Sequence, residues 1–186
     1  MILKNMSFAL LLCGGLLLMG SAAQAESVKT PVNKISPDGV GEEIGFITFS
    51  DADGGGVDII VDLTGLPEGE HGMHVHENAS CAPAEKDGKM VAGLAAGGHY
   101  DPMKTNKHAG PGKAGHKGDL PHIMADAEGV AKAKLHAPNL QAKDLKGHSV
   151  MIHEGGDNYT DNPPLGGGGA RMDSDMLPRK KTDFPP

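Results

Sequence analysis

The chain has 186 residues, a formal net charge of -7 at pH 7 and only six aromatic residues, but 28 glycines. The acidic balance argues against nucleic acid as a partner, because phosphate backbones are bound by clustered lysine and arginine. Abundant glycine with few aromatics favours short elements joined by turns around an aliphatic core. These properties exclude a basic nucleic-acid-binding protein and a chain built from long helices.

Residues 1–25 have the features of a cleavable secretory signal. Lys4 gives a positive start, the segment 8–19 is apolar, and Ala23-Gln24-Ala25 is a small-x-small cleavage site. We therefore expect the mature chain to begin at Glu26 and to be exported. Removal of Lys4 changes its formal charge from -7 to -8.

Two alternatives to cleavage are less favoured. An uncleaved membrane anchor would need roughly 20 apolar residues, more than the run contains. Lipidation at Cys13 is disfavoured because Leu12 precedes it, where a small residue is required. The mature protein is thus expected to have no membrane attachment and to keep one cysteine, Cys81, an odd number for an exported protein.

The remaining residues, about 160, suit one domain. Short segments of alternating polarity are separated by turn residues, which indicates strands. In one of them Val57, Ile59, Val61 and Leu63 alternate with polar residues, as in a half-buried strand. The sequence predicts an all-β antiparallel sandwich or barrel with two hairpins, from strands at Ile44–Ser50, Val57–Leu63, 71–77, Leu120–Ala125, Val130–His136 and His148–His153.

Two segments do not fit this pattern. Residues 78–118 are mostly Gly, Ala, Pro, Lys and His without a period, and residues 154–170 end in "PLGGGGA". A loop of such length inside one domain is expected only if it is functional or tied down.

All ten histidines lie between positions 71 and 153. In the stretch "HGMHVHE", His74 and His76 are two residues apart, so a strand places both on one face where they can reach one metal ion. His71 faces the other way and is expected to hydrogen-bond to backbone. A solvated face is the alternative for such a pair.

The first long loop contributes a second group. His99, His108, His116 and Asp119 supply three imidazoles and a carboxylate, a set that zinc accepts in a tetrahedral site. These residues could also be plain solvated surface. A bound metal would explain the loop better, because ligand bonds supply ordering free energy that this apolar-poor segment lacks.

A third position lies far along the chain. His153 ends the segment "VMIH" and, with His74 and His76, would form a nitrogen-rich set suited to copper. The remaining three histidines have no partner spacing and are interpreted as surface or packing residues: His122, His136 and His148.

Taken together, six motifs occur in an order that resembles the copper-zinc superoxide dismutase family, in its bacterial periplasmic branch. They are "GEHGMHVHENASC", "AAGGHYDP", "KHAGP", "GHKGDLP", "MIHEGGDNYTD" and "PLGGGGAR", and the likeness runs from Gly41 to Arg171. It implies an immunoglobulin-like Greek-key antiparallel β-sandwich or barrel with two long functional loops, located in the periplasm.

The resemblance also implies a ligand for each metal position. One histidine, His99, would bridge both metals as an imidazolate. Asp157 would hydrogen-bond one copper and one zinc histidine, and Arg171 would guide the substrate anion. The implied copper ligands are His74, His76, His99 and His153, and the implied zinc ligands are His99, His108, His116 and Asp119.

The implied activity is dismutation of superoxide to dioxygen and hydrogen peroxide by alternate reduction and reoxidation of copper, with zinc holding the bridge. His99 would take a proton when the bridge to copper breaks. Because the whole protein is negative, local positive charge must attract the superoxide anion. Arg171, Lys113 and Lys117 are the candidates.

The sequence departs from the family after Arg171. The family continues with an Ala-Cys-Gly segment that forms the last strand and holds the disulfide partner of the loop cysteine. Residues 172–186, "MDSDMLPRKKTDFPP", have no cysteine, three prolines and a charge run. We therefore expect a domain at 26–171 and a disordered tail at 172–186.

The altered tail leaves the function open between two classes. Loss of the disulfide and of the last strand would compromise stability, the placement of Arg171 and any homodimer. An exported protein that binds copper or zinc without turnover is therefore the alternative to the enzyme. A purely structural sandwich is disfavoured by the order of the motifs.

Overall fold

The computed structural model describes residues 26–162, 166 and 168–176. The expected signal segment, its cleavage site and the last ten residues of the expected tail lie outside the described residues. Strands in the described part are β1 (Ser27–Ser36), β2 (Gly39–Asp51), β3 (Val57–Leu63), β4 (Gly69–His71), β5 (Met73–His76), β6 (Ala84–Lys86), β7 (Lys89–Val91), β8 (Ile123–Ala125), β9 (Ala131–Ala137), β10 (Ser149–His153) and β11 (Arg171–Met176). Two 3-10 helices, η1 (Leu94–Ala96) and η2 (Ala142–Leu145), lie in the connections.

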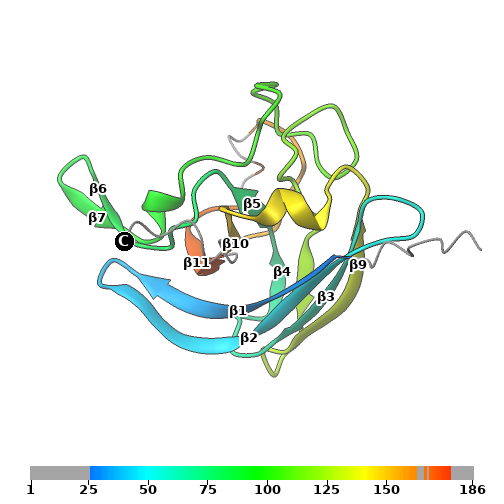
Figure 1. The fold of residues 1–186 in the computed structure, drawn as a ribbon. Coiled ribbons are helices and arrows are strands. Elements are labelled where there is room, and N and C mark those ends of the chain that lie inside the picture. Colours follow the sequence, from blue (N-terminus) through cyan, green and yellow to red (C-terminus); the bar gives the residue numbers. More distant parts are fainter. Residues whose placement is uncertain (1–25, 163–165, 167, 177–186) are drawn as a thin grey trace, which may run out of the picture.

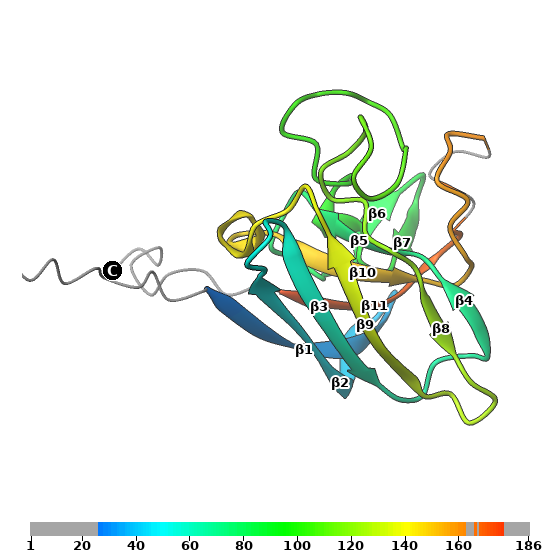
Figure 2. The same cartoon turned by 90° about the vertical axis from the view of Figure 1, so that its right-hand side faces the viewer.

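The strands form an antiparallel Greek-key β-sandwich, as predicted. Seven strands make one curved sheet in the order β5-β10-β11-β1-β2-β3-β9 (Figure 1). β4 leads directly into β5 and pairs with β8, which leads into β9, so this pair links the two edges of the large sheet. The chain crosses from β9 to β10 through η2 (Figure 2). This crossing places β10 beside β5, which is distant from it in sequence.

The apolar alternation in β3 directs its burial. Val57, Ile59, Val61 and Leu63 are buried, and the residues between them are exposed. β3 pairs with β2 from Gly45↔Leu63 to Asp51↔Val57, so the first predicted hairpin is confirmed. The largest fully buried side chains are Phe49, Ile47, Ile59, Leu63, Met73, Leu120, Ile123, Leu140, Leu145, Met151 and Ile152.

Strands β5 and β10 are buried on both faces. Val75 and Val150 are opposite each other in the ladder and belong to the main core, whereas His74 lies opposite Met151 on the other face. His76 lies opposite Ser149 on that same face. The histidines therefore sit outside the barrel core, and the long loops must cover them.

Backbone bonds tie the first long loop to the free edge of β5. Val75 donates its N–H to Gly118 O at 2.9 Å, and Tyr100 donates to Val75 O at 2.8 Å. Isolated bridges join His74 to Asp119 and His76 to His99. A Cβ at Gly118 would lie 2.3 Å from Val75 O, so only glycine permits this approach. These backbone hydrogen bonds to the edge of β5 therefore order part of the loop, in addition to any order that metal binding would supply.

The second predicted hairpin is wrong in its pairing. β8 and β9 flank a tight turn at 126–129, but the ladder partner of β8 is β4 and that of β9 is β3. At this turn the chain passes from the small β4–β8 sheet into the edge strand of the large sheet. β1 and the β6–β7 hairpin inside the long loop were not predicted from the sequence.

The expectation of a missing last strand is wrong for residues 172–176. β11 begins at Arg171 and pairs with β10 from Ser149↔Met176 to His153↔Arg171, and with β1 at two positions. The three prolines and the charge run, which argued for disorder, all follow Met176 in the sequence. A strand inserted between two others has partners for its backbone on both sides, so a polar sequence can occupy it.

We predict that β11 is required for a stable fold. A chain ending at Arg171 should unfold at a midpoint lower by about 10 °C or more than a chain ending at Met176, since it leaves two open strand edges and loses several kcal/mol. Thermal unfolding of the two truncated chains, followed by circular dichroism, measures the difference. Equal midpoints would contradict the role given to residues 172–176.

Candidate metal centre

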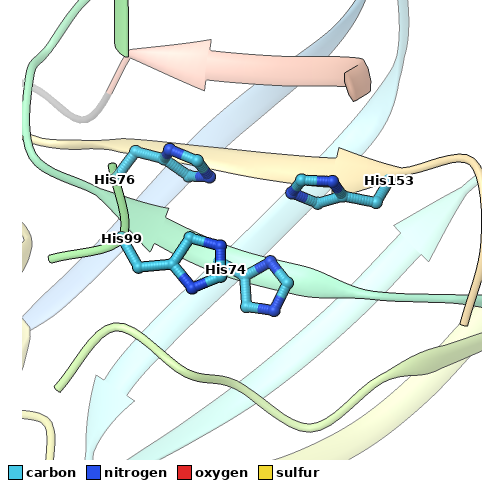
Figure 3. A group of neighbouring side chains, drawn as sticks. All are labelled: His74, His76, His99 and His153. Atoms are coloured by element: carbon cyan, nitrogen blue, oxygen red, sulfur yellow. The ribbon is translucent and has the colours of Figure 1, made fainter. Parts of the chain in front are cut away.

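Four histidines from three parts of the fold meet on the outer face of β5 and β10. His74 and His76 come from β5, His153 from the end of β10, and His99 from the loop bridged to β5. One nitrogen of each ring lies within 4.8 Å of the corresponding nitrogens of the other three. Figure 3 shows the four rings gathered around one space.

In three of these rings, one nitrogen donates a hydrogen bond away from the shared space. His74 Nε2 donates to Asp157 Oδ2 at 2.6 Å, His76 Nδ1 to Gly97 O at 3.0 Å, and His153 Nδ1 to Gly169 O at 3.3 Å. A neutral imidazole that donates from one nitrogen carries a lone pair on the other. In these four rings, the buried nitrogens left without a hydrogen-bond partner are His74 Nδ1, His76 Nε2, His99 Nε2 and His153 Nε2.

Burial keeps these rings neutral. It lowers the pKa of His99 to about 4, with a further contribution from His74, and the pKa of His153 to about 3. Burial also lowers the pKa of His74 and, well below its usual value, that of His76. The positive charge of Arg171 adds to the lowering at His76 and His153. Neutral imidazoles with converging lone pairs are the ligand form that a metal ion requires.

A second group forms around the carboxylate of Asp119. Its Oδ1 lies 3.2 Å from His99 Nδ1, 3.0 Å from His108 Nδ1 and 3.3 Å from His116 Nδ1. The Ala109 and Gly110 N–H groups donate to Oδ2 of the same carboxylate. Three imidazole nitrogens and one carboxylate thus converge, as the sequence predicted for this set.

Both His74 and His116 lie close enough to Asp119, His99 and His108 to be the fourth member of this second group. Ligand atoms of His74, His99, His108 and Asp119 all lie within 4.8 Å of one another, whereas His116 is 11% exposed at its side chain. His74 already donates from Nε2 to Asp157, and its Nδ1 belongs to the first group. His116 Nδ1 has no hydrogen-bond partner and is therefore the better candidate.

Asp157 links the two groups. Its Oδ2 accepts from His74, and its Oδ1 accepts from His108 Nε2 at 2.7 Å. Burial would raise the pKa of Asp157, but hydrogen bonds from His108 and His74 outweigh burial and lower it. The same balance, with His108 and His99 as donors, lowers the pKa of Asp119. Both carboxylates therefore remain charged inside the site.

His108 has the opposite electrostatic character from the first group. Burial would lower its pKa, but hydrogen bonds to Asp119 and Asp157 outweigh burial and raise it to about 9. Both of its ring nitrogens face carboxylate oxygens, at 3.0 and 2.7 Å, which is the geometry of a protonated ring. In the absence of a metal ion, His108 supplies the positive charge between the two carboxylates.

Arg171 lies at the start of β11, beside this face. Its Nη1 and Nη2 donate to Gly93 O and Gly97 O, both at 2.6 Å, and Gly97 O also accepts from His76. Partial burial lowers the pKa of the guanidinium without neutralising it. β11 thus places Arg171 beside the first group, so its expected misplacement is not observed.

Six other predicted positions fall outside the two groups. His122 is partly buried, with its Nδ1 3.1 Å from the Tyr159 hydroxyl. His71, as predicted, binds backbone, with ring nitrogens 2.8 Å from His153 O and Pro67 O. His136 is on the surface beside Asp58, and His148 packs on Tyr100 and contacts His76 O. Of the two lysines, Lys113 is exposed, and Lys117 pairs with Asp144 at 2.7 Å, which cancels much of its local charge.

Sequence reasoning missed three residues that support the site. Asp161 accepts the His108 N–H at 3.0 Å, and Glu77 accepts the Gly98 N–H at 3.0 Å next to His99. Tyr159 donates its N–H to Asp157 Oδ1 at 2.7 Å. Glu77 and Asp161 stand inside or beside the quoted motifs, but their backbone partners are distant in sequence and could not be inferred from spacing.

Comparison with known proteins gives consistent matches. The family model for copper/zinc superoxide dismutase (SODC) matches residues 43–174. The chain is 48% identical over 166 residues to a superoxide dismutase [Cu-Zn] of Brucella abortus, covering 88% of this chain and 95% of that protein. It is 46% identical over 171 residues to one of Escherichia coli (strain K12), covering 91% and 96%. The solved structure of the Brucella abortus enzyme superposes with a TM-score of 0.80 at 48% identity, covering 82% of this chain and all of that one.

We predict that the first group still binds copper at pH 5. Because the pKa values of His99 and His153 are about 4 and 3, these rings stay neutral at pH 5, well below the reference histidine pKa of about 6.5. Copper(II) titration followed by visible absorbance at pH 7 and pH 5 should give the same stoichiometry. Loss of binding with a midpoint near the ordinary histidine pKa would contradict the buried neutral cluster.

We predict that zinc binding displaces a proton from His108. With a pKa of about 9, this ring is protonated at pH 7, and zinc needs its neutral form, so about one proton should be released per zinc ion. Calorimetric titration of the metal-free protein in two buffers of different ionisation enthalpy measures the release. In Asp157→Asn, which removes one of the charges that raise this pKa, fewer protons should be released; an unchanged number would contradict the assignment.

Proposed function

Because the chain belongs to the copper/zinc superoxide dismutase family, whose activity is dismutation of superoxide with copper and zinc, we propose residue roles for this reaction. The observation that carries the proposal is the set of four buried imidazole nitrogens that face one space without a hydrogen-bond partner. Buried polar atoms are almost always paired, so such a set needs a ligand. The proposed copper ligands are His74, His76, His99 and His153.

The zinc position follows from the Asp119 group. Its nitrogens are all Nδ1 atoms, and they surround one carboxylate oxygen at 3.0 to 3.3 Å. Three nitrogens and one oxygen form a donor set that zinc accepts. The proposed zinc ligands are His99, His108, His116 and Asp119.

His99 belongs to both sets through opposite sides of one ring. Its Nδ1 faces Asp119, and its Nε2 is one of the unpartnered nitrogens of the first group. This arrangement supports a role in which His99 would hold both metals. Nε2 is then the atom that can take up and return a proton during turnover.

Copper, when bound, supplies the one-electron oxidation and reduction that convert superoxide to dioxygen and to hydrogen peroxide. The protein's part is to hold the ligands, exclude competing groups and admit the anion. The side chains of His74 and His99 are fully buried and His76 is buried as well, whereas His153 is 5% exposed and lines a surface groove. The open side of the first group is therefore at His153.

Arg171 is suited to orient superoxide on this open side. Arg171 and His153 both line a groove of about 800 Å³. The two hydrogen bonds from Arg171 to Gly93 O and Gly97 O fix the guanidinium plane. Its positive charge contributes to the lowered pKa values of His76 and His153. A fixed cation beside the copper ligands attracts a small anion in an otherwise acidic protein.

The alternative of a metal-binding protein without turnover loses its main support. That alternative depended on the absence of the last strand and of a second cysteine. β11 is present and holds Arg171, and the absent cysteine bears on stability rather than on the ligands. No described residue of either proposed ligand set lies apart from its group. The enzyme is therefore the function that the geometry supports best.

We further propose export to the periplasm after cleavage of residues 1–25. The composition of this segment supports the proposal, and the relatives are bacterial proteins. Among the described residues, no helix is sufficiently long and apolar to cross a membrane.

Superoxide turnover by the copper- and zinc-loaded protein tests the proposal. We predict activity in the wild-type protein and a loss of at least about 100-fold in His99→Ala, because that change removes a ligand of both metals. His136→Ala is the matched control, since His136 is exposed and its ring pairs with Asp58 on the surface. Full metal loading without dismutation in the wild type would reject the enzyme.

A further inference from the structure

Tyr159 occupies a position between the two buried carboxylates of the site. It lies two residues after Asp157, and its backbone N–H donates to Asp157 Oδ1 at 2.7 Å. The same oxygen accepts from His108 Nε2. The backbone of Tyr159 therefore helps to set the carboxylate that orients a proposed zinc ligand.

The hydroxyl of Tyr159 is anchored to a different part of the fold. It accepts the backbone N–H of His122 at 2.8 Å and lies 3.1 Å from His122 Nδ1. His122 immediately precedes β8, which pairs with β4. The tyrosine thus connects the loop of Asp157 to the small sheet that closes the barrel.

The ring of Tyr159 covers the second carboxylate site. A Cβ at Gly110 would lie 2.8 Å from two ring atoms, so the ring packs directly on this glycine. Gly110, with a φ of +83°, donates its N–H to Asp119 Oδ2 at 3.2 Å. Through Gly110 the ring limits how far the backbone that holds Asp119 can move.

Tyr159 adopts this position with an unfavourable backbone conformation. Its φ is +55°, in the left-handed region, and the other described non-glycine residues there are Asp87, Lys104 and Asn106. A bulky aromatic residue is rarely found in this region and stays there only when surrounding contacts hold it. The conformation is what directs the N–H at Asp157 while the hydroxyl reaches His122.

We propose that Tyr159 is a positioning residue for the zinc side of the metal centre, acting through Asp157 and through Gly110. This inference rests on the proposed zinc ligands. The hydroxyl anchor fixes the ring, and the ring and the strained backbone together fix both carboxylates. The effect is partial, because Asp157 is also held by Glu70 Oε1, which accepts its N–H at 3.2 Å.

The test compares Tyr159→Phe with Tyr100→Phe in the copper- and zinc-loaded protein. Tyr100 is the other tyrosine of the chain, and its ring packs on His148 rather than on the carboxylates. We expect Tyr159→Phe to release zinc to a chromogenic chelator about tenfold faster than wild type, the lower end for outer partners of metal ligands. Tyr100→Phe should release zinc at the wild-type rate.

A spectroscopic measurement separates positioning from general stability. With cobalt(II) in the zinc position, Tyr159→Phe should change the visible bands, which report ligand geometry, while Tyr100→Phe should not. If both variants lower the unfolding midpoint of the metal-free protein equally, the zinc effect of Tyr159→Phe alone supports the proposal. A zinc release rate within about twofold of wild type, with unchanged cobalt bands, would overturn it.

A second variant keeps the inference testable if Tyr159→Phe does not fold. His122→Phe removes Nδ1 but keeps a ring and the backbone N–H, so zinc release should be faster than in the wild type, by less than the roughly tenfold change expected when the hydroxyl itself is removed. No acceleration in the folded His122→Phe protein would overturn the anchoring role of the hydroxyl. A wild-type protein that takes up no zinc would instead overturn the proposed ligand set, and this inference with it.

Discussion

The structure depends on the burial of several imidazoles in one small space. A buried imidazole is tolerated when it is neutral and when a fixed acceptor takes its N–H. Asp157, Gly97 O and Gly169 O provide such acceptors for three rings of the first group. The opposite nitrogens are then left without partners, and each such atom costs about 1–3 kcal/mol in the absence of a ligand. Folding the protein therefore prepares a site whose unsatisfied atoms are relieved by metal binding.

The two buried carboxylates need donors around them, whereas the imidazoles of the first group need acceptors. Asp119 and Asp157 are charged and buried, and such groups are stable only with donors around them. Backbone N–H groups and histidines supply those donors, and His108 stands between the two carboxylates with both ring nitrogens. A divalent ion that replaces the proton of His108 would strengthen the same arrangement, because it brings two positive charges instead of one. The zinc side is thus held electrostatically, while the copper side is held by neutral lone pairs.

The local sequence pattern was sufficient to predict an element whose position and buried face follow from its own alternation. The alternation of Val57 to Leu63 predicted β3 to the residue, and the two-residue spacing of His74 and His76 placed both on one face. Two strands that depend on distant partners and lack a clear alternation, β1 and β11, were not found. Pro31 interrupts the pattern of β1, and β11 is polar, yet both are held in the sheet by neighbours that are far away in sequence.

The same contrast between local pattern and contacts distant in sequence holds for the site. Spacing along the chain indicated a zinc set and a copper set, but it could not show that one ring faces both, since that depends on the rotation of His99 against two strands. The bridging role came from the family resemblance. Tyr159 gave no signal, because its function lies in a left-handed backbone and in contacts to His122 and Gly110 that only the folded chain creates.

The position of the site outside the barrel core separates folding from metal loading. The main core cluster is apolar and contains none of the proposed ligands. The loop that carries His99 and Asp119 is attached to β5 by backbone bonds that need no metal. A metal-free chain can therefore form the barrel and dock this loop, leaving the ligand nitrogens in place before either ion arrives. Such an order would suit the export proposed above, because the ions would then enter a site that the fold has already built.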